Sequence, residues 1–280
     1  MDISPIISAQ ELADLIGTKN LVIADAGSGA EARERYLKEH ISGSHYVDLN
    51  EDLAEVPADA KNGGRHPLPS LDKFAALLAS LGITRDSHVI VYDDKNAANA
   101  AARFWWMLRA AGYTKVQVLD GGLQEAIKNG IPVNVDIPKV QDTELPTLET
   151  WSLPTIDLGR VDAFSKNSEA LIIDVRENER YCGETEPIDL VAGHIPSAIN
   201  LPFKNNLDGD GKFKKPEVLR AYFTEILGDH LTENIAVHCG SGVTACHTLL
   251  AMHYAGLSIP KLYVGSWSEW SRNFKPVEKL

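Results

Sequence analysis

An internal repeat constrains this chain more than any other feature, because the second half of the sequence restates the first in the same order and with similar spacing. Near the start of each half an apolar run ends in aspartate, at residues 21–25 and 171–174. A second apolar run, at residues 89–93 and 235–239, leads into a loop and then a helix. Short apolar runs that alternate with helices are typical of parallel strands buried on both faces. The sequence therefore predicts two α/β units of one design.

Each unit is expected to hold a mainly parallel sheet covered by helices on both faces, since right-handed strand–helix–strand units build that layered fold. The length of 280 residues fits two such domains, with one large α/β barrel as the alternative. Prolines without helical periodicity indicate a linker at residues 136–154. We therefore expect an N-terminal domain at residues 1–135 and a C-terminal domain at residues 155–280.

The composition favours chemistry on small molecules. There are 27 Lys and Arg residues against 39 Asp and Glu, which gives a formal net charge of −12. An acidic protein without a local basic patch repels phosphate backbones and anionic lipid, so neither nucleic acid nor a membrane is an expected partner. No apolar run approaches the roughly 18 residues of a membrane span, and the N-terminal segment lacks the regions of a secretion signal. A cytoplasmic location is therefore expected.

The three cysteines, Cys182, Cys239 and Cys246, are an odd number in a chain too large to need disulfide staples, so no disulfide framework is expected. Each cysteine is then a buried side chain, a metal ligand or a nucleophile. A zinc site would have to use His238 and His247 with two of the cysteines, but no second pair of ligands has the spacing of a zinc site. We expect neither a metal nor another cofactor.

The strongest chemical signal lies where the second strand of the C-terminal half is expected to end and its helix to begin. The loop there consists of Cys239, Gly240, Ser241, Gly242, Val243 and Thr244. The glycines let successive backbone N–H groups converge on one anion, and the dipole of the following helix adds to the attraction. Such a nest favours a thiolate nucleophile. A buried cysteine beside an ordinary glycine turn is the alternative, but ligands of α/β folds gather at this edge of the sheet.

Several segments together identify a resemblance that covers nearly the whole chain. Residues 174–176, 193–196, 239–245 and 265–270 resemble the motifs of tandem-domain rhodanese-type sulfurtransferases. The resemblance implies two rhodanese-like domains, of which the N-terminal copy is catalytically silent and the C-terminal copy carries sulfur as a persulfide on its cysteine. Asp93 stands at the equivalent position of the first half, and a carboxylate can neither accept sulfane sulfur nor leave as a thiolate.

The loop after Cys239 resembles the 3-mercaptopyruvate sulfurtransferase branch, because thiosulfate-type members typically carry basic residues there. The resemblance implies that Arg180 binds the carboxylate of the donor in a bidentate contact. A surface arginine on a helix is the alternative interpretation. Animal members use a second arginine a few residues further on, where this chain has an acidic stretch at residues 184–189. Replacing Asp189 with arginine is therefore predicted to tighten the binding of mercaptopyruvate.

A long irregular stretch at residues 51–70 contains Arg65 and His66, and loops of this length inside compact domains are often functional. The resemblance implies a Ser-His-Asp relay that includes Ser241 and His66, with Asn50 at the acidic position. The alternative is that Ser241 is a small hydrogen-bonding residue and His66 an ordinary loop histidine.

The sequence as a whole predicts a sulfurtransferase. Its expected partners are a small-molecule sulfur donor, with 3-mercaptopyruvate favoured over thiosulfate, and cyanide or a thiol acceptor such as thioredoxin. A cysteine phosphatase would need an arginine six positions after the cysteine, where Ala245 stands. A sulfur-carrier module without turnover is the other alternative, and the intact cysteine loop disfavours it.

Overall fold

The computed structural model describes residues 3–98, 100–139 and 143–280. The chain divides into two compact units, which are described separately. Unit 1 comprises Met1–Glu55 and Pro69–Ser152, and unit 2 comprises Val56–Leu68 and Leu153–Leu280. The loop at residues 56–68 is therefore part of unit 2, although it lies in the first half of the sequence.

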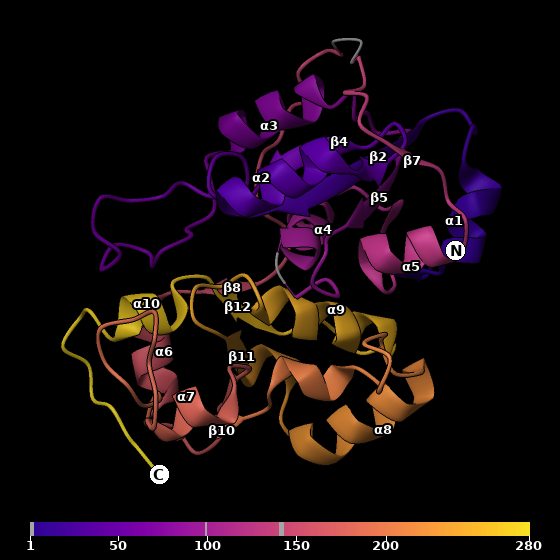
Figure 1. The fold of residues 1–280 in the computed structure, drawn as a ribbon. Helices are drawn as coiled ribbons and strands as arrows, with labels where there is room; N and C mark the ends of the chain where they lie inside the picture. Colours follow the sequence, from indigo (N-terminus) through magenta and orange to yellow (C-terminus); the bar gives the residue numbers. More distant parts are fainter. Residues whose placement is uncertain (1–2, 99, 140–142) are drawn as a thin grey trace. The chain divides into compact units, whose positions relative to one another are not determined.

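Unit 1 has a five-stranded, fully parallel sheet in the order β1-β6-β5-β2-β4 (Figure 1). Its strands are β1 (Ile6–Ile7), β2 (Leu21–Gly27), β4 (His45–Asp48), β5 (His88–Tyr92) and β6 (Val116–Leu119). Its helices are α1 (Ala9–Leu15), α2 (Gly29–Lys38), α3 (Leu71–Ser80), α4 (Ala100–Ala110) and α5 (Gly122–Lys128). A short antiparallel pair joins β3 (His40–Ile41) to β7 (Val133–Asn134).

Unit 2 has a second five-stranded parallel sheet, in the order β10-β9-β11-β12-β8. Its strands are β8 (Thr155–Ile156), β9 (Leu171–Asp174), β10 (Ile199–Asn200), β11 (Ile235–His238) and β12 (Lys261–Tyr263). Its helices are α6 (Leu158–Phe164), α7 (Asn178–Cys182), α8 (Pro216–Leu227), α9 (Ala245–Tyr254) and α10 (Ser266–Trp270), with short 3₁₀ helices at Phe203–Asn206 and Thr232–Asn234. Strand for strand, this order matches that of unit 1, so the predicted repeat of two α/β units is confirmed.

The repeat extends to individual side chains. Tyr36 stacks on His40 in unit 1, and Tyr181 stacks on His194 in unit 2, each pair with ring centroids 3.9 Å apart. Nδ1 of each histidine lies within hydrogen-bond distance of the carbonyl oxygen of its tyrosine, at 2.6 Å for His40 and 2.8 Å for His194. The tyrosine–histidine pair therefore ties the helix to the turn that follows it in both units.

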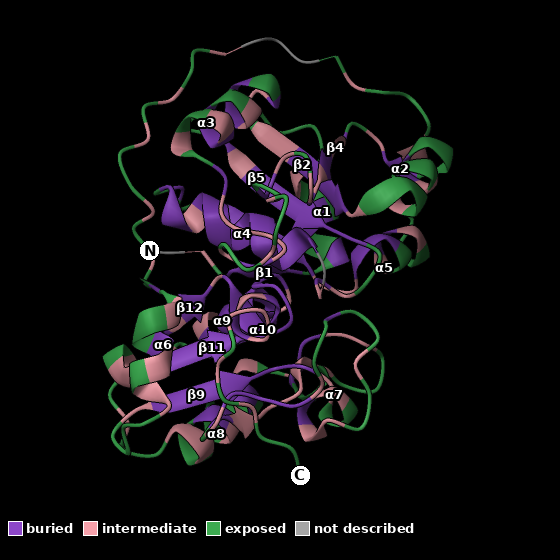
Figure 2. Cartoon of the chain, turned by 90° about the vertical axis from the view of Figure 1, so that its left-hand side faces the viewer, coloured by how far each residue is buried: buried purple, intermediate pink, exposed green. Residues whose placement is uncertain are grey.

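Burial of apolar residues on the strands holds each sheet between its helices. Figure 2 shows β9 and β11 of unit 2 as buried along their length. Trp267 and Trp270 of α10 are fully buried in the same core as Ile172 and Ala236. Large buried aromatic side chains dominate such a core energetically, which agrees with the packing role expected of these tryptophans. No helix among the described residues is long and apolar enough to cross a membrane.

The strand order determines where a site can form in unit 2. β11 is the central strand, with β9 and β12 as its hydrogen-bonded neighbours. Because all three strands are parallel, the loops after them meet at one edge of the sheet. Those loops contain residues 175–177, 239–244 and 264–265, which include the predicted nucleophile.

Candidate active site

Cys239 lies directly after β11, and the residue is only 3% exposed. Three hydrogen bonds fasten the backbone around it to the segment after β12. Trp267 N donates to Cys239 O at 3.0 Å and Ser268 N donates to Gly240 O at 2.9 Å. Cys239 N in turn donates to Ser266 Oγ at 3.2 Å. The start of α10 therefore fixes the first turn of the cysteine loop.

Gly242 permits the loop to turn into α9. Its φ of +71° lies in the left-handed region, and a Cβ built there would lie 2.3 Å from the carbonyl oxygen of Val264. No other residue fits without moving the backbone. Val243 and Thr244 follow it and accept the first backbone hydrogen bonds of α9, from Cys246 and His247, each at 3.0 Å. The predicted loop residues therefore lie together between β11 and α9.

The equivalent loop of unit 1 surrounds a buried carboxyl group. Asp93 follows β5, and its Oδ1 accepts the backbone N–H groups of Lys95 and Ala97, both at 2.9 Å. Its Oδ2 accepts that of Ala101 at 3.3 Å. Burial raises the pKa of the Asp93 carboxyl, although these three hydrogen bonds act in the opposite direction. The loop of unit 1 therefore directs backbone N–H groups at the oxygens of a buried side chain, an arrangement that is also predicted for the loop of Cys239.

A second difference between the units concerns the aspartate at the end of the first apolar run. In unit 1, Asp25 is bound by Arg35, with Nη2 to Oδ1 at 2.6 Å. In unit 2 the corresponding Asp174 is bound instead by Arg176, with Nη2 to Oδ2 at 2.6 Å. Arg180 precedes Tyr181 as Arg35 precedes Tyr36, so Arg180 is the counterpart of Arg35. In unit 2, however, Arg176 takes the place of that arginine beside the aspartate. Arg176 thus leaves Arg180 available for the cysteine loop.

Arg180 lies beside the cysteine loop, as predicted. Its guanidinium nitrogens are 3.5 and 3.6 Å from the position that a Cβ of Gly240 would occupy. Nη2 of Arg180 donates to Glu186 Oε1 at 2.6 Å and, more weakly, to Asp189 Oδ2 at 3.5 Å. Burial alone would raise the pKa of Glu186, but hydrogen bonds from Arg180 and from the backbone N–H of Asp189 hold that pKa below its usual value. Glu186 is therefore an ionised partner that orients Arg180.

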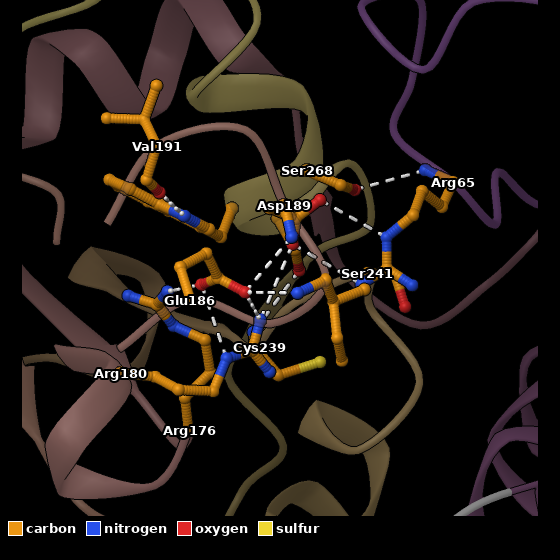
Figure 3. A network of polar contacts seen from close by, with 12 residues as sticks. Arg65, Arg176, Arg180, Glu186, Asp189, Val191, Cys239, Ser241 and Ser268 are labelled. Carbon is orange, nitrogen blue, oxygen red and sulfur yellow. Dashed lines mark hydrogen bonds and ion pairs between the residues drawn. The ribbon is translucent and has the colours of Figure 1, made fainter. Parts of the chain in front are cut away.

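Asp189 has a role that the sequence did not indicate. Its side chain is 0% exposed, and it accepts hydrogen bonds from three arginines, Arg65, Arg180 and Arg272. Figure 3 shows Arg65 and Arg180 reaching it from opposite sides. Asp189 is therefore the counter-ion that holds these arginines in place, and not simply the acidic residue that replaces a second arginine.

Arg65 is a second residue of the site to which sequence reasoning assigned no role. Its Nε and Nη2 donate to the two carboxylate oxygens of Asp189 at 3.3 and 3.4 Å. Nη2 also lies 3.0 Å from the position that a Cβ of Gly240 would occupy. The only feature of the sequence that indicated a role for Arg65 was its position in the long irregular stretch at residues 51–70.

His66 and Ser241 are brought together as predicted, with His66 Nδ1 and Ser241 Oγ hydrogen-bonded at 2.7 Å. Asn50, at the acidic position of the relay, belongs to unit 1, so the third member of the relay stays a prediction. Cys246 is buried at the start of α9, and its Sγ donates to Gly242 O at 3.4 Å. No group of three His, Cys, Asp or Glu side chains in the described part of the chain could hold a metal ion.

Comparisons with known proteins identify the family. The model of the rhodanese-like domain matches twice, at residues 8–129 and 158–273. A probable 3-mercaptopyruvate sulfurtransferase of Pseudomonas aeruginosa is 37% identical over 96% of each chain. Bovine thiosulfate sulfurtransferase is 37% identical over 88% of this chain and 82% of its own. The crystal structure of SseA from Escherichia coli, a 3-mercaptopyruvate sulfotransferase, is similar to this chain with a TM-score of 0.78 and 31% identity, covering 95% of this chain and all of that one. The chain therefore belongs to the rhodanese family, as a sulfurtransferase with two tandem rhodanese domains.

Proposed function

We propose that this enzyme moves sulfane sulfur from 3-mercaptopyruvate, through a persulfide on Cys239, to a thiol or cyanide. The observation that carries the proposal is the position of Cys239 at the base of an anion-binding loop, with the guanidinium of Arg180 beside the next residue, Gly240. The loop holds the reacting sulfur, and the arginine holds the carboxylate of the donor.

The first half-reaction begins when the thiolate of Cys239 attacks the sulfur of the donor. An S–S bond forms as the bond between that sulfur and the donor's methylene carbon breaks. The electron pair of the broken bond leaves as the enolate of pyruvate, which takes up the proton released by the new persulfide. The backbone N–H groups of the loop then stabilise the persulfide anion, in the way that the N–H groups of the unit 1 loop donate to the carboxyl oxygen of Asp93.

The second half-reaction regenerates the enzyme. An acceptor thiolate or cyanide attacks the outer sulfur, the S–S bond breaks, and Cys239 leaves as a thiolate. The products are an acceptor persulfide or thiocyanate. In this proposal unit 1 is catalytically silent, because Asp93 occupies the position of the nucleophile.

Thiosulfate is a second candidate donor, and a specific contact favours it. The cysteine loop has no basic residue, but two guanidinium groups, from Arg65 and Arg180, lie within 3.6 Å of the Cβ position of Gly240. They supply the positive charge that a dianion needs. The chain is also about as similar to thiosulfate sulfurtransferases as to 3-mercaptopyruvate sulfurtransferases.

The donor is tested by comparing kcat/KM for 3-mercaptopyruvate and thiosulfate, with cyanide as the common acceptor. We expect 3-mercaptopyruvate to be preferred, because its single carboxylate matches one bidentate arginine contact. A higher kcat/KM for thiosulfate would assign the donor to the second candidate. Turnover of neither donor would contradict the proposed function.

Arg180→Ala is expected to lower kcat/KM for 3-mercaptopyruvate by about ten- to hundredfold, because a hydrogen bond to a charged group contributes about 1.5–3 kcal/mol. Arg180→Lys should recover only part of this loss, since an ammonium keeps the charge but lacks the planar fork. Arg160→Ala, which removes an exposed arginine near the start of α6, is the matched control. If folded Arg180→Ala stays within twofold of wild type, the carboxylate is held elsewhere.

A cytoplasmic location and a protein thiol acceptor such as thioredoxin complete the proposal. None of the three cysteines forms a disulfide, which is typical of a reducing compartment. A free thiol is also the acceptor that such a compartment supplies in abundance. Release of sulfide from the persulfide by reduced thioredoxin, measured with purified components, tests the acceptor directly.

A further inference from the structure

We propose that the segment at residues 276–280 positions Arg180 for donor binding, because it closes the base of the loop at residues 183–193. This loop carries Glu186 and Asp189, the two carboxylates that bind Arg180. The inference rests on the proposed function, which assigns the carboxylate of the donor to Arg180. It adds positioning residues that act through Arg180 and do not touch the donor.

Comparison of the two units identifies the loop as an addition to unit 2. In unit 1, Tyr36 and its stacked partner His40 are 4 residues apart, whereas Tyr181 and His194 in unit 2 are 13 residues apart. The stacking is the same in both units, with ring centroids 3.9 Å apart. Unit 2 therefore has nine additional residues between two side chains that are placed alike. Since unit 2 also carries the predicted nucleophile, the addition is expected to serve the reaction.

The acidic side chains of the loop are turned inward. The carboxylates of Glu186 and Asp189 are 3% and 0% exposed. Glu186 Oε1 accepts from Arg180 Nη2 at 2.6 Å, and also from the backbone N–H groups of Ile188 and Asp189 at 3.1 and 3.0 Å. Figure 3 shows Glu186 and Asp189 beside Arg180. The position of Arg180 therefore depends on the path of the loop backbone.

Residues 276–280 tie the two ends of the loop together. Leu280 N donates at 3.1 Å to the carbonyl oxygen of Cys182, which immediately precedes the loop. Glu278 N donates at 3.0 Å to the carbonyl oxygen of His194, which immediately follows the loop. His194 N donates in return to Glu278 O at 2.9 Å. One short segment therefore holds both ends of the loop.

The first and last residues of the loop fit closely against this segment. They are Gly183 and Gly193, with φ values of +83° and +126°. A Cβ at Gly193 would lie 2.5 Å from Glu278 O, and one at Gly183 would lie 2.8 Å from Cγ of Lys279. Glycine at both positions therefore lets the segment approach the backbone of the loop.

The segment is itself fixed to the core of unit 2. Trp270, which is fully buried, donates its indole N–H to Pro276 O at 2.8 Å. Val277 packs against the core cluster that contains Trp270. The segment is therefore a fixed support, and a loop whose two ends are held to such a support has fewer conformations available to it.

Unit 1 offers a matched control, because it has the same kind of support without the additional loop. β7 pairs with β3 so that Asn134 is the partner of His40, as Glu278 is the partner of His194. In both units the pairing is antiparallel. Disrupting the pairing in unit 1 should therefore lower stability without moving Arg180.

The test compares Glu278→Pro with Asn134→Pro in the full chain. Proline has no backbone N–H, so each substitution disrupts one of the two equivalent pairings. We expect Glu278→Pro to raise KM for 3-mercaptopyruvate about five- to tenfold, on the scale of a lost backbone hydrogen bond, while kcat stays within about twofold of wild type. Asn134→Pro should lower Tm by about as much as Glu278→Pro does, and its KM should stay within about twofold of wild type.

A second readout shows whether the cysteine loop is disturbed. Alkylation of Cys239 by uncharged iodoacetamide is followed across pH by peptide mass. Its rate and pH dependence should match wild type in both variants, because the three hydrogen bonds between the cysteine loop and the start of α10 do not involve residues 276–280. An unchanged KM in folded Glu278→Pro, equal rises of KM in the two proline variants, or slowed alkylation of Cys239 would overturn the inference.

The same measurements distinguish this inference from the proposed function. If wild type turns over neither donor, the proposed function is wrong. If wild type turns over a donor and folded Glu278→Pro keeps the wild-type KM, only the role of residues 276–280 is wrong. Should Glu278→Pro not fold, Leu280→Pro takes its place, because it removes only the hydrogen bond to Cys182 and changes an exposed residue. Its KM should rise about threefold, and a wild-type KM in that variant would equally contradict the inference.

Discussion

Cys239→Ser is expected to lose activity with every donor, by about a thousandfold or more in kcat/KM. A serine hydroxyl at this position has no adjacent base of the required strength, and an alkoxide is a far poorer leaving group than a thiolate. Intact-mass measurement after treatment with donor should show one added sulfur atom on wild type and none on the variant. No other side chain of the site can carry the sulfur, so the loss should be the same for 3-mercaptopyruvate and thiosulfate.

Two further cysteine variants provide the control. Cys246 lies at the buried start of α9, where serine can still donate to the carbonyl oxygen of Gly242. Cys182 is the last residue of α7 and is half-buried. Cys246→Ser and Cys182→Ser should therefore keep most of the wild-type activity. Appreciable turnover by Cys239→Ser would contradict a persulfide at this position.

The fold and the position of Cys239 were predictable because they depend on local patterns. Apolar runs at residues 171–174 and 235–239 mark strands whatever surrounds them, and the first is β9 to the residue. A cysteine followed by glycines at the end of the second run lies at the edge of the sheet where ligands bind. The position of Cys239 in the loop between β11 and α9 follows from those two facts. Neither fact depends on which residues approach from elsewhere in the chain.

The arginine network was not predictable, because it depends on contacts between distant segments. Arg65 lies 124 residues before Asp189, and His66 lies 175 residues before Ser241. The sequence of the acidic stretch indicated the loss of an arginine, whereas in three dimensions Glu186 and Asp189 hold the arginines that are present. The different arginine partners of Asp25 and Asp174 were not predictable either, because they are found only by comparing the contacts of the two aspartates in the structure.

Asp189→Arg should lower activity and stability together, which reverses the expectation from sequence. The substitution removes a buried carboxylate that three arginines share and places a fourth guanidinium among them. Breaking a buried ion pair by removing one partner costs about 3–5 kcal/mol, because the remaining charge stays buried without compensation. We expect a fall of about 10 °C in Tm. The kcat/KM for 3-mercaptopyruvate should fall by at least about a hundredfold, as Arg65 and Arg180 separate.

Two companion variants identify the cause. Asp189→Asn keeps the shape of the side chain and removes its charge, so its losses should be smaller than those of Asp189→Arg. Asp210→Arg makes the same change of net charge at an exposed turn and should leave both Tm and kcat/KM near wild type. Tighter binding of 3-mercaptopyruvate by Asp189→Arg, with an unchanged Tm, would mean that Asp189 does not hold the arginines. The added guanidinium would then bind the carboxylate of the donor beside Arg180, as the sequence comparison with the two-arginine members of the family implies.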